Sequence, residues 1–141
     1  MIWPFRRKSK KRMARIVIDE PITSSTRVSV LKALKQIEDR EFPALILRID
    51  SPGGTVGDSQ EIYSAIKRLK EKGCKVVASF GNISASGGVY IGVASDKIVA
   101  NPGTITGSIG VIIRGNNLSE LLNKIGIKFE TVKSGIYKDI L

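Results

Sequence analysis

A short segment of small polar residues carries the chain's best candidate nucleophile. Ser86 belongs to the sequence GNISASGG (residues 81–88), which separates two apolar runs. A serine between a strand and a helix can hold its hydroxyl at the helix N-terminus, with the N–H of Gly87 pointing the same way. Backbone donors beside a hydroxyl suit acyl transfer, because they stabilise the oxyanion of a tetrahedral intermediate. The alternative is that Ser84 and Ser86 only cap the following helix.

A second glycine turn could supply another donor. The sequence DSPGGT (residues 50–55) follows an apolar run and precedes a helical pattern. Its glycines leave the backbone free to direct N–H groups toward an anion. The Lys-Ser/Thr ending of a phosphate-binding loop and the glycine spacing of a dinucleotide site are both missing. Taken alone, this segment is better explained as an ordinary turn from a strand to a helix.

The composition restricts the chemistry further. The chain has no histidine and one cysteine, which excludes a Ser-His-Asp triad, a Cys-His pair and most zinc sites. A metal site would need oxygen ligands alone, and no loop of clustered carboxylates offers one. We therefore expect no metal and no cofactor. Cys74 cannot form an internal disulfide and is expected at the edge of the core.

The elements that must hold these turns alternate between strand and helix patterns, which is typical of an α/β fold. Helical spacing of apolar residues predicts one helix around residues 28–37, capped by Ser24 or Ser25, and another from Asp58 to about residue 69. Residues 81–88 are expected to form a turn and not a strand. The expected strands are 14–18, 44–49, 75–80, 97–100 and 129–132, with further helices at 89–94 and 118–125.

The length of 141 residues suits one folded domain, preceded by a basic tail. Six of the 23 cationic residues lie in residues 1–12, and the rest of the chain contains the other 17 together with 13 acidic residues. The tail, residues 1–13, is expected to be disordered, with peripheral contact to an anionic membrane through Trp3 and Phe5 as the alternative.

No stacking aromatics are interleaved with the cations, so nucleic acid is not an expected partner. Residues 1–12 lack the apolar core of a secretory signal and no run spans a bilayer, so the expected location is cytoplasmic or at the inner face of a membrane.

Four segments in order carry a family resemblance: IDSPGG, NISASGG, PGTITGSIGVI and ETVKSGIYKDIL. Together they resemble the signal peptide peptidase A family, over residues 14 to 141. The resemblance implies the Clp-protease/crotonase-like spiral of ββα units. It also implies a serine protease that cleaves remnant signal peptides or unfolded protein segments, without a cofactor, as a homo-oligomer.

The same resemblance implies the site residues. The family's nucleophile maps onto Ser86 and its lysine base onto Lys138, with Lys133 as a competing base. The family's oxyanion hole maps onto Gly53 or Gly54 together with Gly87. The family's domain continues beyond the segment that contains Lys138, so residues 14–141 are expected to be the N-terminal catalytic portion of an incomplete peptidase domain.

The lysine base sets a physical demand. A lysine with an ordinary pKa of about 10.4 must be desolvated to lose its proton near neutrality, at a cost of about 4 kcal/mol for a shift of roughly 3 units.

Two other functions stay open. One is a crotonase-like acyl-CoA enzyme, which would need paired carboxylates beside the glycine turns. The other is a non-catalytic, truncated copy that acts as a scaffold or regulator.

Overall fold

The structure, a computed structural model, describes residues 12–113, 115–128, 130, 134 and 135. The chain divides into two units, Met1–Val111 and Ile112–Leu141. Among the described residues, the first unit holds five strands and three helices, and the second holds α4 (Ser119–Lys124). Most of the basic tail lies outside the described residues, so its membrane contact stays a prediction. In the part of the chain that is described, no helix is long and apolar enough to cross a membrane.

Five parallel strands form the sheet of the first unit. They are β1 (Ala14–Ile18), β2 (Ala44–Ser51), β3 (Lys75–Ala85), β4 (Lys97–Val99) and β5 (Ile105–Gly107). The order is β1-β2-β3-β4, and β5 pairs with the end of β3. Because parallel neighbours need crossover connections, a helix follows each of the first three strands. The expected α/β class is confirmed.

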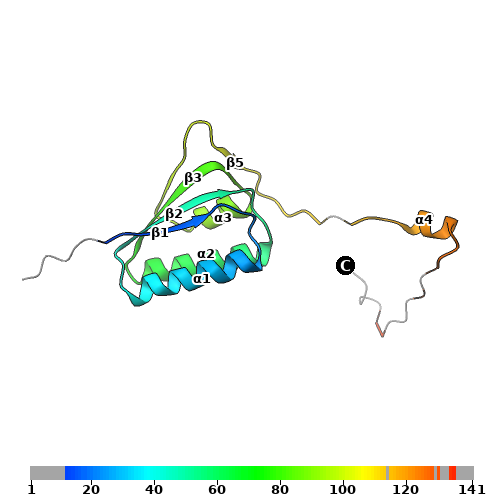
Figure 1. Cartoon of the computed structure of the whole chain (residues 1–141), viewed down its shortest axis with the longest axis horizontal. Helices are drawn as coiled ribbons and strands as arrows, with labels where there is room; N and C mark the ends of the chain where they lie inside the picture. The colour runs from blue at the N-terminus through cyan, green and yellow to red at the C-terminus, as the bar shows by residue number, and fades with distance from the viewer. Residues whose placement is uncertain (1–11, 114, 129, 131–133, 136–141) are drawn as a thin grey trace, which may run out of the picture. The chain divides into compact units, whose positions relative to one another are not determined.

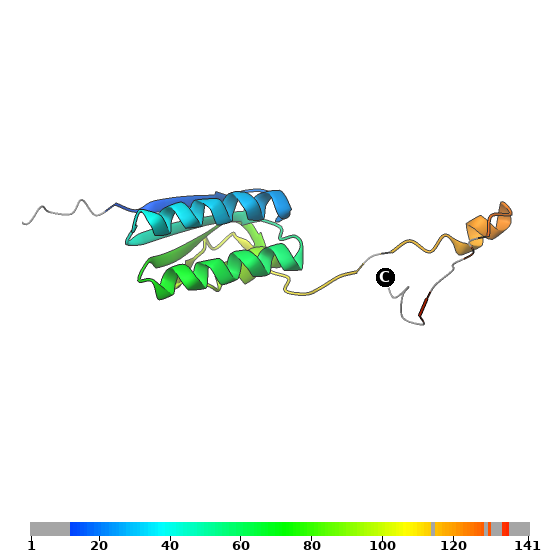
Figure 2. The same cartoon turned by 90° about the horizontal axis from the view of Figure 1, so that it is seen from below.

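Two long helices cover one face of this sheet, as Figures 1 and 2 show. They are α1 (Ser24–Asp39) and α2 (Val56–Glu71). Their buried apolar residues recur at helical spacing and meet alternate residues of β1, β2 and β3, which is the pattern expected of a helix packed on a strand surface. The helices contribute Val30, Leu34, Ile37, Ile62, Ile66 and Leu69 to this core, and the strands contribute Ile16, Ile18, Leu45, Leu47, Ile49, Val76, Ala78 and Phe80.

The helix starts differ from those expected. The N-cap of α1 is Thr23, so the predicted capping residues Ser24 and Ser25 lie inside the helix. Buried Thr26 explains the earlier start, since its hydroxyl accepts the Thr23 N–H at 3.4 Å and donates to the carbonyl of Pro21 at 2.9 Å. Similarly, α2 begins after Thr55, ahead of the predicted start at Asp58.

The largest difference concerns β3, which continues through residues 81–85, where a turn was expected. The prediction was wrong because neighbouring strands satisfy the backbone of this small, polar segment. Its last residues pair with β2 on one side and with β5 on the other, and β5 itself was not expected. The short helix α3 (Gly87–Gly92) begins earlier than expected, and α4 falls within its expected range. The strand expected at 129–132 lies outside the described residues, apart from residue 130.

Candidate active site

Ser86 occupies the junction between β3 and α3. Its backbone has φ 50° and ψ −117°, a conformation that non-glycine residues rarely adopt. The Ser86 N–H donates to the carbonyl of Gly107 at 2.8 Å, so the end of β5 holds this strained residue in place. Its side chain makes no capping hydrogen bond to α3. The helix-cap explanation therefore does not account for Ser86, and such strain is typical of functional positions.

The turn at residues 51–55 is held by the segment between β1 and α1. Ile22, which is fully buried, donates its N–H to the carbonyl of Gly53 at 2.9 Å. The carbonyl of Ile22 accepts the N–H of Thr55 at 3.0 Å. Between these two bonds, Gly54 packs so closely on the Ile22 backbone that no side chain would fit. The turn is thus fixed by main-chain contacts on both sides of Gly54.

The two glycine turns touch each other directly. A Cβ added to Gly53 would lie 2.8 Å from both the Ser86 Cβ and the Gly87 nitrogen. A Cβ added to Gly87 would lie 3.4 Å from the Gly54 nitrogen. The structure therefore brings together all four described residues that the sequence predicted for the site, namely Ser86, Gly53, Gly54 and Gly87.

The backbone donors at this contact are not equivalent. The N–H of Gly53 donates to the Ser51 hydroxyl at 3.2 Å. The bridge to Ile22 uses the carbonyl of Gly53 and the N–H of Thr55, and it leaves the Gly54 N–H unused. Gly87 is the first residue of α3, and the first N–H groups of a helix have no acceptor within it. These contacts thus engage the N–H of Gly53 and leave those of Gly54 and Gly87 available as donors.

The two other serines of these segments are less suitable nucleophiles. Ser84 is fully buried, and its hydroxyl has no hydrogen-bond partner within the described residues. Ser51 is also fully buried and donates its hydroxyl to the carbonyl of Glu20 at 2.7 Å. Ser86 is only partly buried. Of the three hydroxyls, that of Ser86 is the one a substrate could reach.

A polar network that the sequence did not reveal supports the start of α2. The Thr55 hydroxyl donates to Asp58, and Arg27 of α1 contacts the same carboxylate through Nε at 2.9 Å. Arg27 also pairs with Glu61 at 2.8 Å, and mainly this hydrogen bond raises the pKa of Arg27. The sequence signal was Asp58 near a helix start, but nothing in the spacing indicated its partner on α1. This network fixes the helix that follows the Gly53–Gly54 turn.

Both candidate bases, Lys133 and Lys138, lie outside the described residues. The described part of the chain also holds no group of three His, Cys, Asp or Glu side chains that could bind a metal ion.

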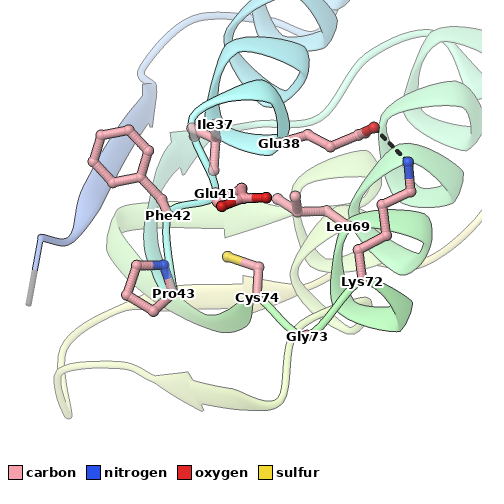
Figure 3. Close-up of a pocket in the computed structure, with 9 residues that line it drawn as sticks. All are labelled: Ile37, Glu38, Glu41, Phe42, Pro43, Leu69, Lys72, Gly73 and Cys74. Atoms are coloured by element: carbon pink, nitrogen blue, oxygen red, sulfur yellow. Dashed lines mark hydrogen bonds and ion pairs between the residues drawn. The ribbon is translucent and has the colours of Figure 1, made fainter. Parts of the chain in front are cut away.

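An open pocket lies at the other end of β3, before its first residue (Figure 3). Phe42, Pro43 and Cys74 line it, and an ion pair between Glu38 and Lys72 lies beside it. Cys74 is 5% exposed, and burial is the main cause that raises the pKa of its thiol. Because Ser86 follows the opposite end of β3, this pocket is separate from the candidate site.

The contact between the turns yields a test of stability. Gly53→Ala should lower the free energy of unfolding by about 1–3 kcal/mol, because the new Cβ would overlap backbone atoms at a residue whose φ is +99°. Gly57→Ala is the matched control, since nothing lies within 4 Å of that Cβ in α2. The free energy of unfolding of the control should be unchanged or rise by up to about 1 kcal/mol, because alanine has a higher helix propensity than glycine. Urea unfolding measures both, and equal stability of Gly53→Ala and wild type would contradict the described contact.

The chain is similar in sequence to known proteases. Residues 68–141 match the Peptidase family S49 and residues 7–104 match the Clp protease family. The chain is 64% identical over its whole length to slr0021 of Synechocystis sp., which is provisionally named a protease, and spans 50% of that protein. It is 42% identical over 104 residues to the chloroplastic serine protease SPPA of Arabidopsis thaliana, covering 74% of this chain and 15% of that protein. The chain thus spans half or less of these relatives.

Solved structures share the fold. ClpP1 N165D from Listeria monocytogenes aligns with a TM-score of 0.54 at 25% identity, over 57% of this chain and 46% of that one. The membrane-bound stomatin-specific protease 1510-N, solved as a mutant with a substrate peptide, aligns with a TM-score of 0.62 at 24% identity, over 80% of this chain and 54% of that one. These alignments confirm the expected Clp-protease-like fold. On the strength of the sequence match over residues 68–141, the chain belongs to peptidase family S49.

Proposed function

We propose that this chain is the N-terminal catalytic portion of a serine endopeptidase of the signal peptide peptidase type. The observation that carries the proposal is the position of Ser86, strained at φ 50° and in contact with the turn that presents the Gly54 N–H. A reachable hydroxyl beside two backbone donors is suited to attack on a carbonyl carbon. Membership of family S49 supports the peptide bond as the target.

The proposed reaction proceeds through an acyl-enzyme. The Ser86 Oγ attacks the carbonyl carbon of the peptide bond while its proton passes to the base. The N–H groups of Gly54 and Gly87 stabilise the negative oxygen of the tetrahedral intermediate. The intermediate then releases the amine, which takes the proton from the base, and leaves an ester on Ser86. Water, deprotonated by the same base, hydrolyses that ester and restores the serine.

Lys138 is the proposed base, and Lys133 is the alternative. Either lysine must be neutral to accept a proton, so its pKa must fall from about 10.4 toward 7, which requires a desolvated environment. The proposed substrates are remnant signal peptides or unfolded segments. The name of one relative supports this substrate class, since a protein of Enterococcus faecium that is 45% identical over 112 residues is provisionally named a signal peptide peptidase.

A serine-directed fluorophosphonate tests the nucleophile. The wild-type chain should be labelled on Ser86, as located by peptide mapping, and Ser86→Ala should lose the label. Ser84→Ala is the matched control and should keep it, because the Ser84 hydroxyl is buried. An unlabelled wild type would favour the non-catalytic copy. Labelling that survives in Ser86→Ala but not in Ser84→Ala would overturn the assignment.

The working form is proposed to be a homo-oligomer in which Ser86 of one subunit meets Lys138 of its neighbour. A neighbouring subunit would exclude water and so lower the pKa of the lysine. The first unit also carries apolar side chains for such a contact, since Ile109 and Val111 are each 73% exposed.

Subunit mixing tests this arrangement. Ser86→Ala and Lys138→Ala chains should each be inactive toward a peptide substrate, and mixed assemblies should regain activity at sites that combine both intact residues. Subunit exchange is followed in parallel with labelled chains. If subunits exchange and no activity returns, both residues of the dyad belong to one chain.

A further inference from the structure

β3 departs from regular pairing just before it reaches Ser86. Ile49 of β2 pairs with Phe80 and Ser51 pairs with Ser84, so a single residue of β2, Asp50, lies opposite residues 81–83 of β3. The extra residues form a bulge, which is a common way to redirect a strand next to an active site. The position of the residues that follow the bulge, including Ser86, therefore depends on the contacts that fix the bulge.

The carboxylate of Asp50, on β2, accepts two hydrogen bonds from residues of the bulge. Its Oδ1 accepts the N–H of Ile83 at 3.0 Å, and its Oδ2 accepts the side-chain amide of Asn82 at 3.2 Å. Gly81 packs against the same carboxyl group so closely that no side chain would fit there. The N–H groups of Ile83 and Asn82, with Arg48 as a weaker contributor, hold the pKa of Asp50 below its usual value. The group is therefore charged at neutral pH, which strengthens its hydrogen bonds.

Asp50 thereby joins the two halves of the candidate site. Along the chain it directly precedes the turn that carries Gly54, and through space it holds the strand that carries Ser86. We propose that Asp50 is a positioning residue, whose bonds to Ile83 and Asn82 set the place of the Ser86 hydroxyl relative to the Gly54 N–H. This inference rests on the proposed function, since it concerns the alignment of that nucleophile.

A second carboxylate provides a control of the same kind. The Oδ2 of Asp96 accepts the N–H of Val76 at 2.8 Å, and this bond is the main cause of its lowered pKa. Val76 belongs to β3 as well, but it lies at the start of the strand, far along the chain from Ser86. Asp96→Ala should therefore reproduce the loss of a carboxylate bonded to a β3 amide without moving the nucleophile.

The experiment measures the rate and the affinity of fluorophosphonate labelling at Ser86, together with thermal unfolding. Asp50→Ala should slow the labelling step by about 100-fold with little change in the affinity for the reagent, because displacing a reacting group by about 1 Å can cost that much. Asp50→Asn should recover most of the rate, since its amide oxygen can still accept the Ile83 N–H. Asp96→Ala should lose stability and keep the wild-type rate.

The outcomes separate the two proposals. If wild type is not labelled on Ser86, the proposed function fails. If wild type is labelled and folded Asp50→Ala reacts as fast, the positioning role is wrong. The role is equally wrong if Asp96→Ala slows labelling as much as Asp50→Ala does.

Should Asp50→Ala not fold, Asn82→Ala replaces it, because this substitution removes the hydrogen bond from the Asn82 amide and keeps the one from the Ile83 N–H. A smaller but clear slowing would support the role, and an unchanged rate would overturn it.

Discussion

The candidate site depends on one close backbone contact, where Gly53 meets Ser86 and Gly87 with no space for a side chain between them. Each partner in this contact is fixed from outside. Ile22 holds the Gly53–Gly54 turn through two main-chain hydrogen bonds, and the carbonyl of Gly107 holds the N–H of Ser86. Because both sides are anchored, the proposed donors would be in place before a substrate arrives, which is what effective stabilisation of an oxyanion requires.

The sheet explains why these segments meet. β2 and β3 are parallel neighbours, so the turns that follow them emerge at the same edge of the sheet, where ligands commonly bind in α/β proteins. Ser86 follows the bulge opposite Asp50 and the pairing with β5, and it contacts the Gly53–Gly54 turn that follows β2. The described elements thus hold the proposed nucleophile and its proposed donors. The proposed base would have to come from the later part of the chain or from a second subunit.

The class of fold and the Gly53–Gly54 turn could be predicted from the sequence because both rest on local patterns. Alternating strand and helix patterns indicated the α/β fold, and glycines next to Ser86 indicated a site. The remaining features depend on contacts between distant residues. The choice of Gly54 over Gly53 as the proposed donor depends on the Ser51 hydroxyl, which already accepts the Gly53 N–H. Likewise, the small residues at 81–85 form a strand only because β2 and β5 pair with them.

In the proposed mechanism, the Gly54 and Gly87 N–H groups face the reacting centre on Ser86. The most direct measurement is a crystal structure of the chain after phosphonylation of Ser86. The phosphoryl oxygen should lie about 2.7–3.1 Å from the nitrogens of both glycines, the spacing expected of an oxyanion hole. A phosphoryl oxygen that points away from both nitrogens, or that is bound by the Gly53 nitrogen instead, would contradict it.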